Sequence, residues 1–207
     1  MAQAIRSRFF VQRSSTMHLV TLLLIAASFS LIEANSIRVN NTGTENLVFI
    51  LQALGHPPSN GTLIEAGNYT EFLVLNEWEG SFYTYPEECL DHPCDYPVTK
   101  ISVAFEKYMF GGFYDFLIVD LNKGFNVPAS IRSVSRPDCD VISCDANLLE
   151  ICSEQDQVVD EAGEVVACQT SVLNYQDFKE RCPNARVDGG DVDLGVCASM
   201  DYELTFG

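Results

Sequence analysis

The sequence is poor in basic residues and in histidine. Its 207 residues contain 12 Lys and Arg against 29 Asp and Glu, so the formal net charge is -17, and only three His are present. Proteins that bind nucleic acid use Lys and Arg to displace counterions from phosphate, and the deficit therefore excludes a nucleic-acid partner. The same deficit disfavours anionic membrane surfaces.

Several motifs that mark enzymes and metal sites are also missing. The chain has neither Gly-x-Ser-x-Gly nor His-Glu-x-x-His, and no phosphate-loop pattern follows Gly111-Gly112. Zinc sites normally contain a close Cys-x-x-Cys pair, and none occurs here. We therefore expect no metal and no cofactor.

The amino terminus has the layout of a secretory signal peptide. Three arginines precede an apolar run over residues 19–32, and small residues follow at 34–36. The run has 14 residues, which is short of the ~20 that span a bilayer. We predict a leader over residues 1–34 with cleavage after Ala34, and a single-span anchor is the alternative. Cleavage would remove three Arg and one Glu, which changes the net charge to -19. The remaining chain would be extracellular, without a membrane span.

The eight cysteines fit this secreted context. Their number is even, and small secreted domains commonly rely on disulfides. Four disulfides are therefore predicted in preference to a metal site, although spacing alone allows 105 connectivities. Three Asn-x-Ser/Thr sequons predict glycosylation at Asn40, Asn60 and Asn68.

Short alternating or apolar segments separated by glycines predict an all-β protein, either a sandwich or a barrel. Residues 144–152 and 175–181 are each predicted to form one or two helical turns. The predicted strands cover residues 36–40, 47–51, 70–75, 82–85, 101–105, 113–119 and 202–206.

Five motifs in order resemble those of the thaumatin-like (pathogenesis-related 5) family, in particular its small members that lack an extra cysteine-rich lobe. They are Phe113-Tyr114-Asp115-Phe116-Leu117-Ile118-Val119-Asp120 with Gly124-Phe125-Asn126-Val127-Pro128, the Cys139–Ala146 segment with Cys152, Gly163–Cys168, Phe178–Ala185, and Tyr202–Phe206.

The resemblance implies one domain over residues 35–207, a thaumatin-like β-sandwich with a disulfide-rich lobe at about 139–182. Family members usually have a further bridge between the first strand and the segment after the final Thr-Phe. Here the corresponding places hold Asn41-Thr42-Gly43 and Gly207, so both partners are missing together. The resemblance implies the pairs Cys89–Cys94, Cys139–Cys197, Cys144–Cys182 and Cys152–Cys168.

The resemblance also implies an acidic cleft built from an Arg, a Glu and three Asp. Asp115 and Asp120 occupy two Asp positions, and Asp191 is the best match for the third, with Asp188 and Asp193 as rivals. The Glu position falls on Ser102 and the Arg position falls near Tyr85. An inserted Lys123 beside the cleft would offset some of its negative charge.

Local geometry restricts this site. Asp115 and Asp120 are five residues apart, so on an unbroken strand they face opposite sides and can share a cleft only if the chain bends. The structural alternatives are a turn or capping role for Asp120 and hydrogen bonds to backbone amides for Asp115. Tyr114 and Phe125 flank the motif as potential sugar contacts, and core packing is the alternative for Phe125.

Trp78 lies on a predicted loop, where an exposed indole would be a further contact residue.

Three functions fit these observations for a secreted monomer in defence or stress. The first is binding of cell-wall polysaccharide, such as β-1,3-glucan, through the acidic cleft. The second is weak glucanase activity by Asp115, Asp120 and Asp191, which needs two suitably placed carboxyls. The third is inhibition of a secreted hydrolase, since the negative charge favours a basic protein partner.

Overall fold

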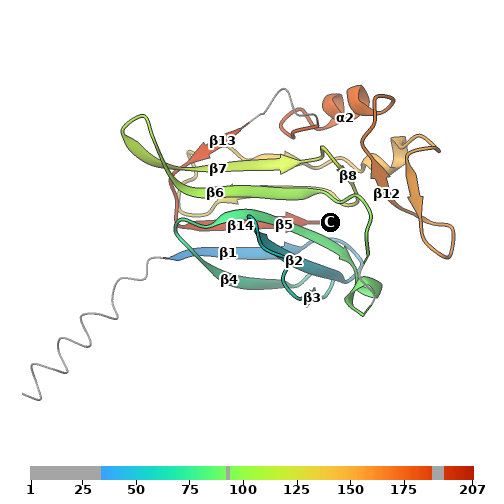
Figure 1. The fold of residues 1–207 in the computed structure, drawn as a ribbon, viewed down its shortest axis with the longest axis horizontal. Coiled ribbons are helices and arrows are strands. Elements are labelled where there is room, and N and C mark those ends of the chain that lie inside the picture. Colours follow the sequence, from blue (N-terminus) through green and yellow to red (C-terminus); the bar gives the residue numbers. More distant parts are fainter. Residues whose placement is uncertain (1–33, 92–93, 188–193) are drawn as a thin grey trace, which may run out of the picture. The chain divides into compact units, whose positions relative to one another are not determined.

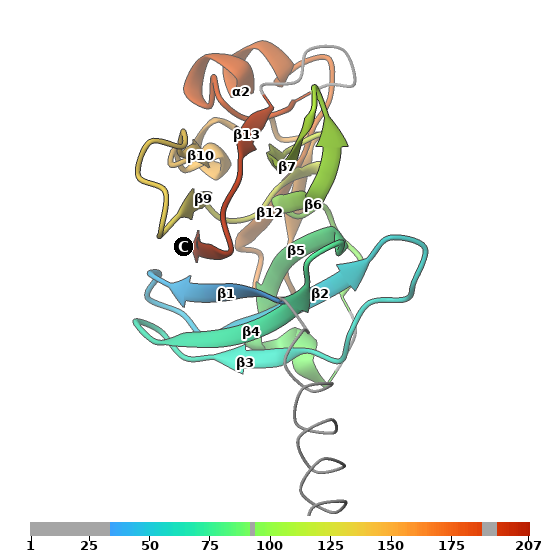
Figure 2. The same cartoon turned by 90° about the vertical axis from the view of Figure 1, so that its left-hand side faces the viewer.

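The computed structural model describes residues 34–91, 94–187 and 194–207, in which two main sheets face each other (Figures 1 and 2). The predicted leader therefore lies, apart from Ala34, outside the described residues, and its cleavage remains a prediction. The first sheet consists, in spatial order, of β10 (Ile142–Cys144), β9 (Ala129–Ser133), β14 (Asp201–Phe206), β1 (Ala34–Asn41) and β4 (Tyr69–Leu75).

The second main sheet has six strands. In spatial order they are β13 (Gly195–Cys197), β7 (Gly112–Asp120), β6 (Lys100–Met109), β5 (Glu79–Pro86), β2 (Leu47–Ala53) and β3 (Thr62–Ile64).

A small third sheet and three short helical segments complete the described elements. They are β11 (Gln157–Val159), β12 (Val165–Gln169) and β8 (Gly124–Phe125), the 3-10 helices η1 (Glu87–Leu90) and η2 (Leu148–Ile151), and helix α2 (Tyr175–Arg181).

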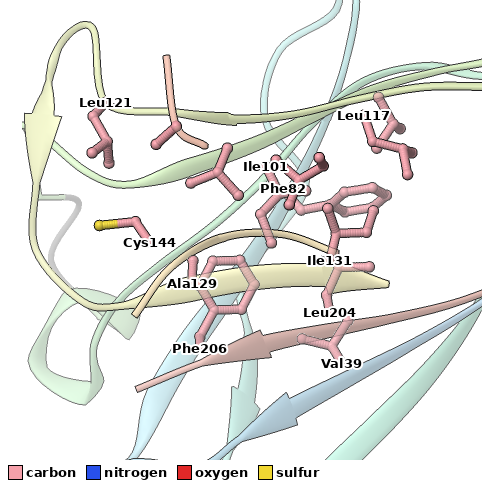
Figure 3. Close-up of a cluster of buried hydrophobic side chains, with 14 of the residues drawn as sticks. Val39, Phe82, Ile101, Leu117, Leu121, Ala129, Ile131, Cys144, Leu204 and Phe206 are labelled. Atoms are coloured by element: carbon pink, nitrogen blue, oxygen red, sulfur yellow. The ribbon is translucent and has the colours of Figure 1, made fainter. Parts of the chain in front are cut away.

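The core lies between the two main sheets because their strands alternate apolar and polar residues. Alternate residues of a strand face opposite sides, so every second side chain of β1, β6 and β7 enters the core. Figure 3 shows Phe82, Ile101 and Leu117 of the six-stranded sheet near Ile131 and Leu204 of the other sheet. All five of these side chains are fully buried.

The predicted all-β sandwich is thus confirmed, with each long predicted strand present. The helical turns at residues 148–151 and 175–181 also lie in the predicted segments. Strands β3 and β8–β13, which have two to five residues each, are not among the predicted strands. Most of them have only two or three residues, which is too few to show a two-residue period.

All eight cysteines lie in the described residues, and they form the four pairs that the resemblance implies. These are Cys89–Cys94, Cys139–Cys197, Cys144–Cys182 and Cys152–Cys168. Three of these bridges involve cysteines of the segment 139–182, in which the described strands are short. By restricting the unfolded chain, such bridges stabilise by about 2–4 kcal/mol each.

Hydrogen bonds join the ends of β1 and β14, at the place where family members usually have a further disulfide. Strands β1 and β14 pair in parallel, with Asn41 opposite Phe206. The backbone N–H of Thr42 donates to the Phe206 carbonyl at 2.8 Å, and its hydroxyl donates to the Gly207 carbonyl at 2.6 Å. A Cβ on Gly207 would lie 2.4 Å from the Gly43 nitrogen, so this close approach requires glycine.

A tight turn with an exposed aromatic residue joins β6 to β7. Met109 pairs with Gly112, which leaves a two-residue loop of Phe110 (φ 51°) and Gly111 (φ 84°). Two positive φ values are typical of a type I′ hairpin turn, which favours Asn or Gly over a bulky side chain. Phe110 is 94% exposed, so packing does not offset this conformational cost.

We predict that Phe110→Asn stabilises the protein by about 1 kcal/mol, because Asn tolerates the left-handed conformation better than Phe. Urea unfolding of the purified protein measures the difference. Val172 is 93% exposed, so Val172→Asn removes an equally exposed apolar side chain and should change stability by less than about 0.5 kcal/mol. A loss of stability in Phe110→Asn would contradict the turn assignment.

Candidate functional site

Asp115 lies on the inner side of β7 and is 2% exposed. Three donors reach its carboxylate: the Glu106 N–H at 2.9 Å, the Ser199 N–H at 3.1 Å and the Tyr202 hydroxyl. Glu106 has a positive φ of 51° and lies where the register between β6 and β7 shifts. The carboxylate therefore holds a β-bulge on one sheet and a tyrosine of the other. Asp115 thus has the alternative role given in the sequence analysis, in which its carboxylate accepts hydrogen bonds from backbone amides.

A small cavity of about 200 Å³ lies beside this carboxylate, with Glu106, Phe113, Ser199 and Met200 among its lining residues. Burial and the hydrogen bond to Asp115 raise the pKa of the Tyr202 hydroxyl above its ordinary value. Tyr202 therefore remains a donor to Asp115 well into the alkaline range.

Asp120 lies on the outer side of β7 and forms an ion pair with Arg186. Its other carboxylate oxygen accepts the Asn122 N–H at 2.9 Å, which is the turn role considered for it. The backbone also pairs here, since Asp120 and Arg186 form a parallel bridge. No local motif identified Arg186, because it is 66 residues away in the sequence.

The structure does not bring Asp115 and Asp120 together. Strand β7 continues from Gly112 to Asp120 without the bend that a shared cleft requires. One carboxylate consequently faces the core and the other faces outward. Asp191, like Asp188 and Asp193, lies outside the described residues, so its place in a cleft remains a prediction.

Two aromatic side chains expected as ligand contacts lie elsewhere. Phe125 is fully buried in the core, so its predicted place in a cleft is wrong and its packing alternative holds. Trp78 is not freely exposed, because its ring stacks on Phe82 with centroids 4.9 Å apart. The sequence around Phe125 and Trp78 does not show whether their side chains face solvent or the core. In the folded protein, tertiary contacts cover both rings. Tyr114 is half-buried on the outer side of β7.

A groove of about 390 Å³ crosses the outer face of the six-stranded sheet. Ser102, at the position where the resemblance implies Glu, shares a hydrogen bond with Ser81 at 3.0 Å. Phe116 and Ile118 of β7 form an apolar wall beside these hydroxyls. Polar and backbone groups of β2 and β5 supply the opposite side, with Gln52 and Glu79 among them. The groove is thus mainly neutral rather than acidic.

A second cavity, of about 480 Å³, lies further along β2 and β5 on the same face. We call it the tyrosine pocket because Tyr83 and Tyr85 line it. It lies next to the groove, since the Tyr83 hydroxyl donates to the Gln52 side chain at 3.4 Å. Tyr85 occupies the place near which the resemblance implies Arg, so this part of the face lacks that positive charge.

The three predicted glycosylation sites differ in accessibility. Asn60 and Asn68 are exposed in loops, whereas Asn40 is half-buried within β1. Asn60 also lines the tyrosine pocket. Glycosylation at each site remains a prediction.

Within the residues that the structure describes, no helix is long and apolar enough to cross a membrane. The same residues include no group of three or more His, Cys, Asp or Glu arranged to hold a metal ion.

The two facing sheets and the four disulfides define a small disulfide-stabilised β-sandwich protein. The chain belongs to the Thaumatin family, whose sequence profile matches residues 45–207.

Curated relatives share only part of this chain. Thaumatin-like protein 2 of Prunus persica is 33% identical over 84 residues, which cover 35% of each chain. The glucan endo-1,3-beta-glucosidase of Prunus avium is 33% identical over 84 residues, covering 35% of this chain and 34% of its own. Thaumatin-like protein 1 of Castanea sativa is 25% identical over 136 residues, covering 53% and 54%. The chain thus spans between a third and about half of the length of these relatives.

Two solved structures also resemble the chain. The protein elicitor MoHrip2 from Magnaporthe oryzae has a TM-score of 0.48 at 10% identity, over 84% of this chain and 98% of its own. The thaumatin-like xylanase inhibitor TLXI has a TM-score of 0.42 at 14% identity, over 82% and 97%.

We predict that Tyr202→Phe destabilises the protein by about 1–3 kcal/mol at pH 7, because Asp115 loses a buried charge-assisted donor. Between pH 7 and alkaline pH, the free energy of unfolding of the variant should also fall less than that of the wild type. Since the pKa of Tyr202 is raised on folding, its contribution is complete below the ordinary tyrosine pKa of about 10 and is lost as the pH rises above it.

Urea unfolding between about pH 7 and 11 measures both effects. Tyr69→Phe is the matched control, because Tyr69 is 61% exposed and should lose little stability. An unchanged pH slope in Tyr202→Phe would contradict the assigned role.

Proposed function

We propose that this protein binds cell-wall polysaccharide on the outer face of the six-stranded sheet without hydrolysing it. The observation that carries the proposal is the open groove of about 390 Å³, in which the Ser81 and Ser102 hydroxyls adjoin Phe116 and Ile118. Sugar rings present apolar C–H faces and polar hydroxyl edges, and this lining offers partners for both. A secreted role in defence or stress is part of the same proposal and rests on the family and the predicted leader.

Weak glucanase activity is the second candidate, and the relative from Prunus avium carries that activity in its name. The arrangement of the described carboxylates argues against it here. Glycoside hydrolysis needs two carboxyls on either side of one bond, whereas Asp115 is buried and Asp120 is paired with Arg186 on the opposite face of β7. Ser102 cannot replace a carboxylic acid as a proton donor at neutral pH.

Binding to insoluble β-1,3-glucan, with release of reducing sugar measured in the same tubes, tests this proposal. We expect retention of the wild-type protein without sugar release. Phe116→Ala should weaken retention by about fivefold, since an aromatic contact contributes roughly 1 kcal/mol. Leu73→Ala is the matched control, because Leu73 is 77% exposed on β4 of the other sheet, and it should bind like the wild type.

Two outcomes would contradict the proposal. Reducing sugar released by the wild type and lost in Asp120→Asn would favour the glucanase. Absence of glucan binding, together with tight binding to a purified secreted hydrolase, would favour the inhibitor hypothesis.

A further inference from the structure

The tyrosine pocket has the features of a preformed binding site. Its volume of about 480 Å³ lies in the range of small-ligand pockets. Tyr83, Tyr85 and Tyr96 pack edge to face in a row, with ring centroids 5.7 Å and 5.2 Å apart. Such packing fixes the ring orientations before any ligand binds.

Covalent and hydrogen-bonded constraints hold the walls of this pocket. The Cys89–Cys94 disulfide forms one wall, and Pro58 and Asn60 belong to the loop that forms another. Ser59 fastens that loop to β2, because its hydroxyl accepts the Leu51 N–H at 3.0 Å and its N–H donates to the Leu51 carbonyl at 2.8 Å. The binding surface therefore requires little ordering when a ligand arrives.

Exposed acidic residues directly adjoin, in the chain, residues that line the pocket. Helix η1, whose Cys89 and Leu90 line it, also carries exposed acidic residues, and Asp91 and Asp95 follow. Burial raises the pKa values of Tyr85 and Tyr96, and the charges of Asp95 and Glu88 respectively raise them further. Anionic ligands such as phosphates and uronic acids would be repelled.

The same surroundings attract cations. Aromatic faces attract ammonium groups, and the Lys100 ammonium already lies 4.7 Å from the Tyr83 ring centroid. Lys100 lies over the Tyr83 ring, and Tyr85 is the other tyrosine that lines the pocket. An Arg near the position of Tyr85, as the resemblance implies, would repel a cationic ligand, and this chain lacks it.

We propose that the tyrosine pocket binds an amino sugar with a free ammonium group, as found in a deacetylated amino polysaccharide. The C–H face of the pyranose ring packs against Tyr85, and the ammonium lies toward Glu88 and Asp95. This inference rests on the proposed function, because it names the class of sugar taken at one end of the same face.

Calorimetry with a glucosamine trimer and with its fully N-acetylated counterpart tests the inference, using folded protein produced in a host that adds no N-glycans. The acetylated trimer has the same ring and linkage without the charge. At low salt we expect the glucosamine trimer to bind at least tenfold more tightly. Glu88→Gln/Asp95→Asn should reduce this preference to less than about threefold.

Aromatic contact is tested separately from charge. Tyr85→Ala should lose most of the affinity for both trimers, whereas Tyr85→Phe should retain it because the ring remains. Glu154→Gln/Glu161→Gln is the matched control, since it removes two exposed acidic charges far along the chain from the pocket. An equal loss of affinity in this control would show general attraction between polyions and would overturn the inference.

A soluble β-1,3-glucan oligomer in the same experiment separates this inference from the proposed function. Binding of the glucan oligomer with no preference for the ammonium sugar would overturn the inference and leave the proposed function standing. Failure of all three oligomers to bind would overturn both.

Discussion

The two-residue alternation of strand β7 determines where the side chains of this protein's central motif point. The strand is hydrogen-bonded to β6 along one edge and to β13 along the other, which keeps it extended. Asp115, Leu117 and Val119 consequently enter the core, while Phe116 and Ile118 line the outer groove. One strand thereby supplies both the packing that holds the sheets together and the apolar wall of the candidate binding face.

The buried carboxylate of Asp115 shows how this constraint converts an acidic residue into a structural one. A charge in the core is costly unless hydrogen bonds replace its hydration. Donors from the β6 bulge, from Ser199 and from Tyr202 supply those bonds. Because the bulge belongs to the six-stranded sheet and Tyr202 to the five-stranded sheet, the carboxylate connects the two sheets at one end of the sandwich.

The distribution of charge on the outer face differs from what an acidic cleft would give. Neutral hydroxyls and apolar groups line most of the groove, and the acidic side chains gather beside the tyrosine pocket at the far end of β5. Elsewhere, acidic side chains pair with arginines, as in Arg38–Glu71 and Arg132–Glu203 on the five-stranded sheet.

The amino-acid sequence by itself determined the long strands, the sandwich and the family. The resemblance carried by its motifs also implied the four disulfide pairs. The five-residue spacing of Asp115 and Asp120 also indicated that they face opposite sides of one strand, because the alternation of side chains along a strand depends only on local backbone geometry. Only the tertiary structure decided that Arg186 neutralises Asp120, that Phe125 is buried while Trp78 packs against Phe82, and that residues 58–61, β5 and the Cys89–Cys94 bridge enclose one pocket. These features join segments distant in the chain, and their positions depend on strand register and loop paths that no local pattern specifies.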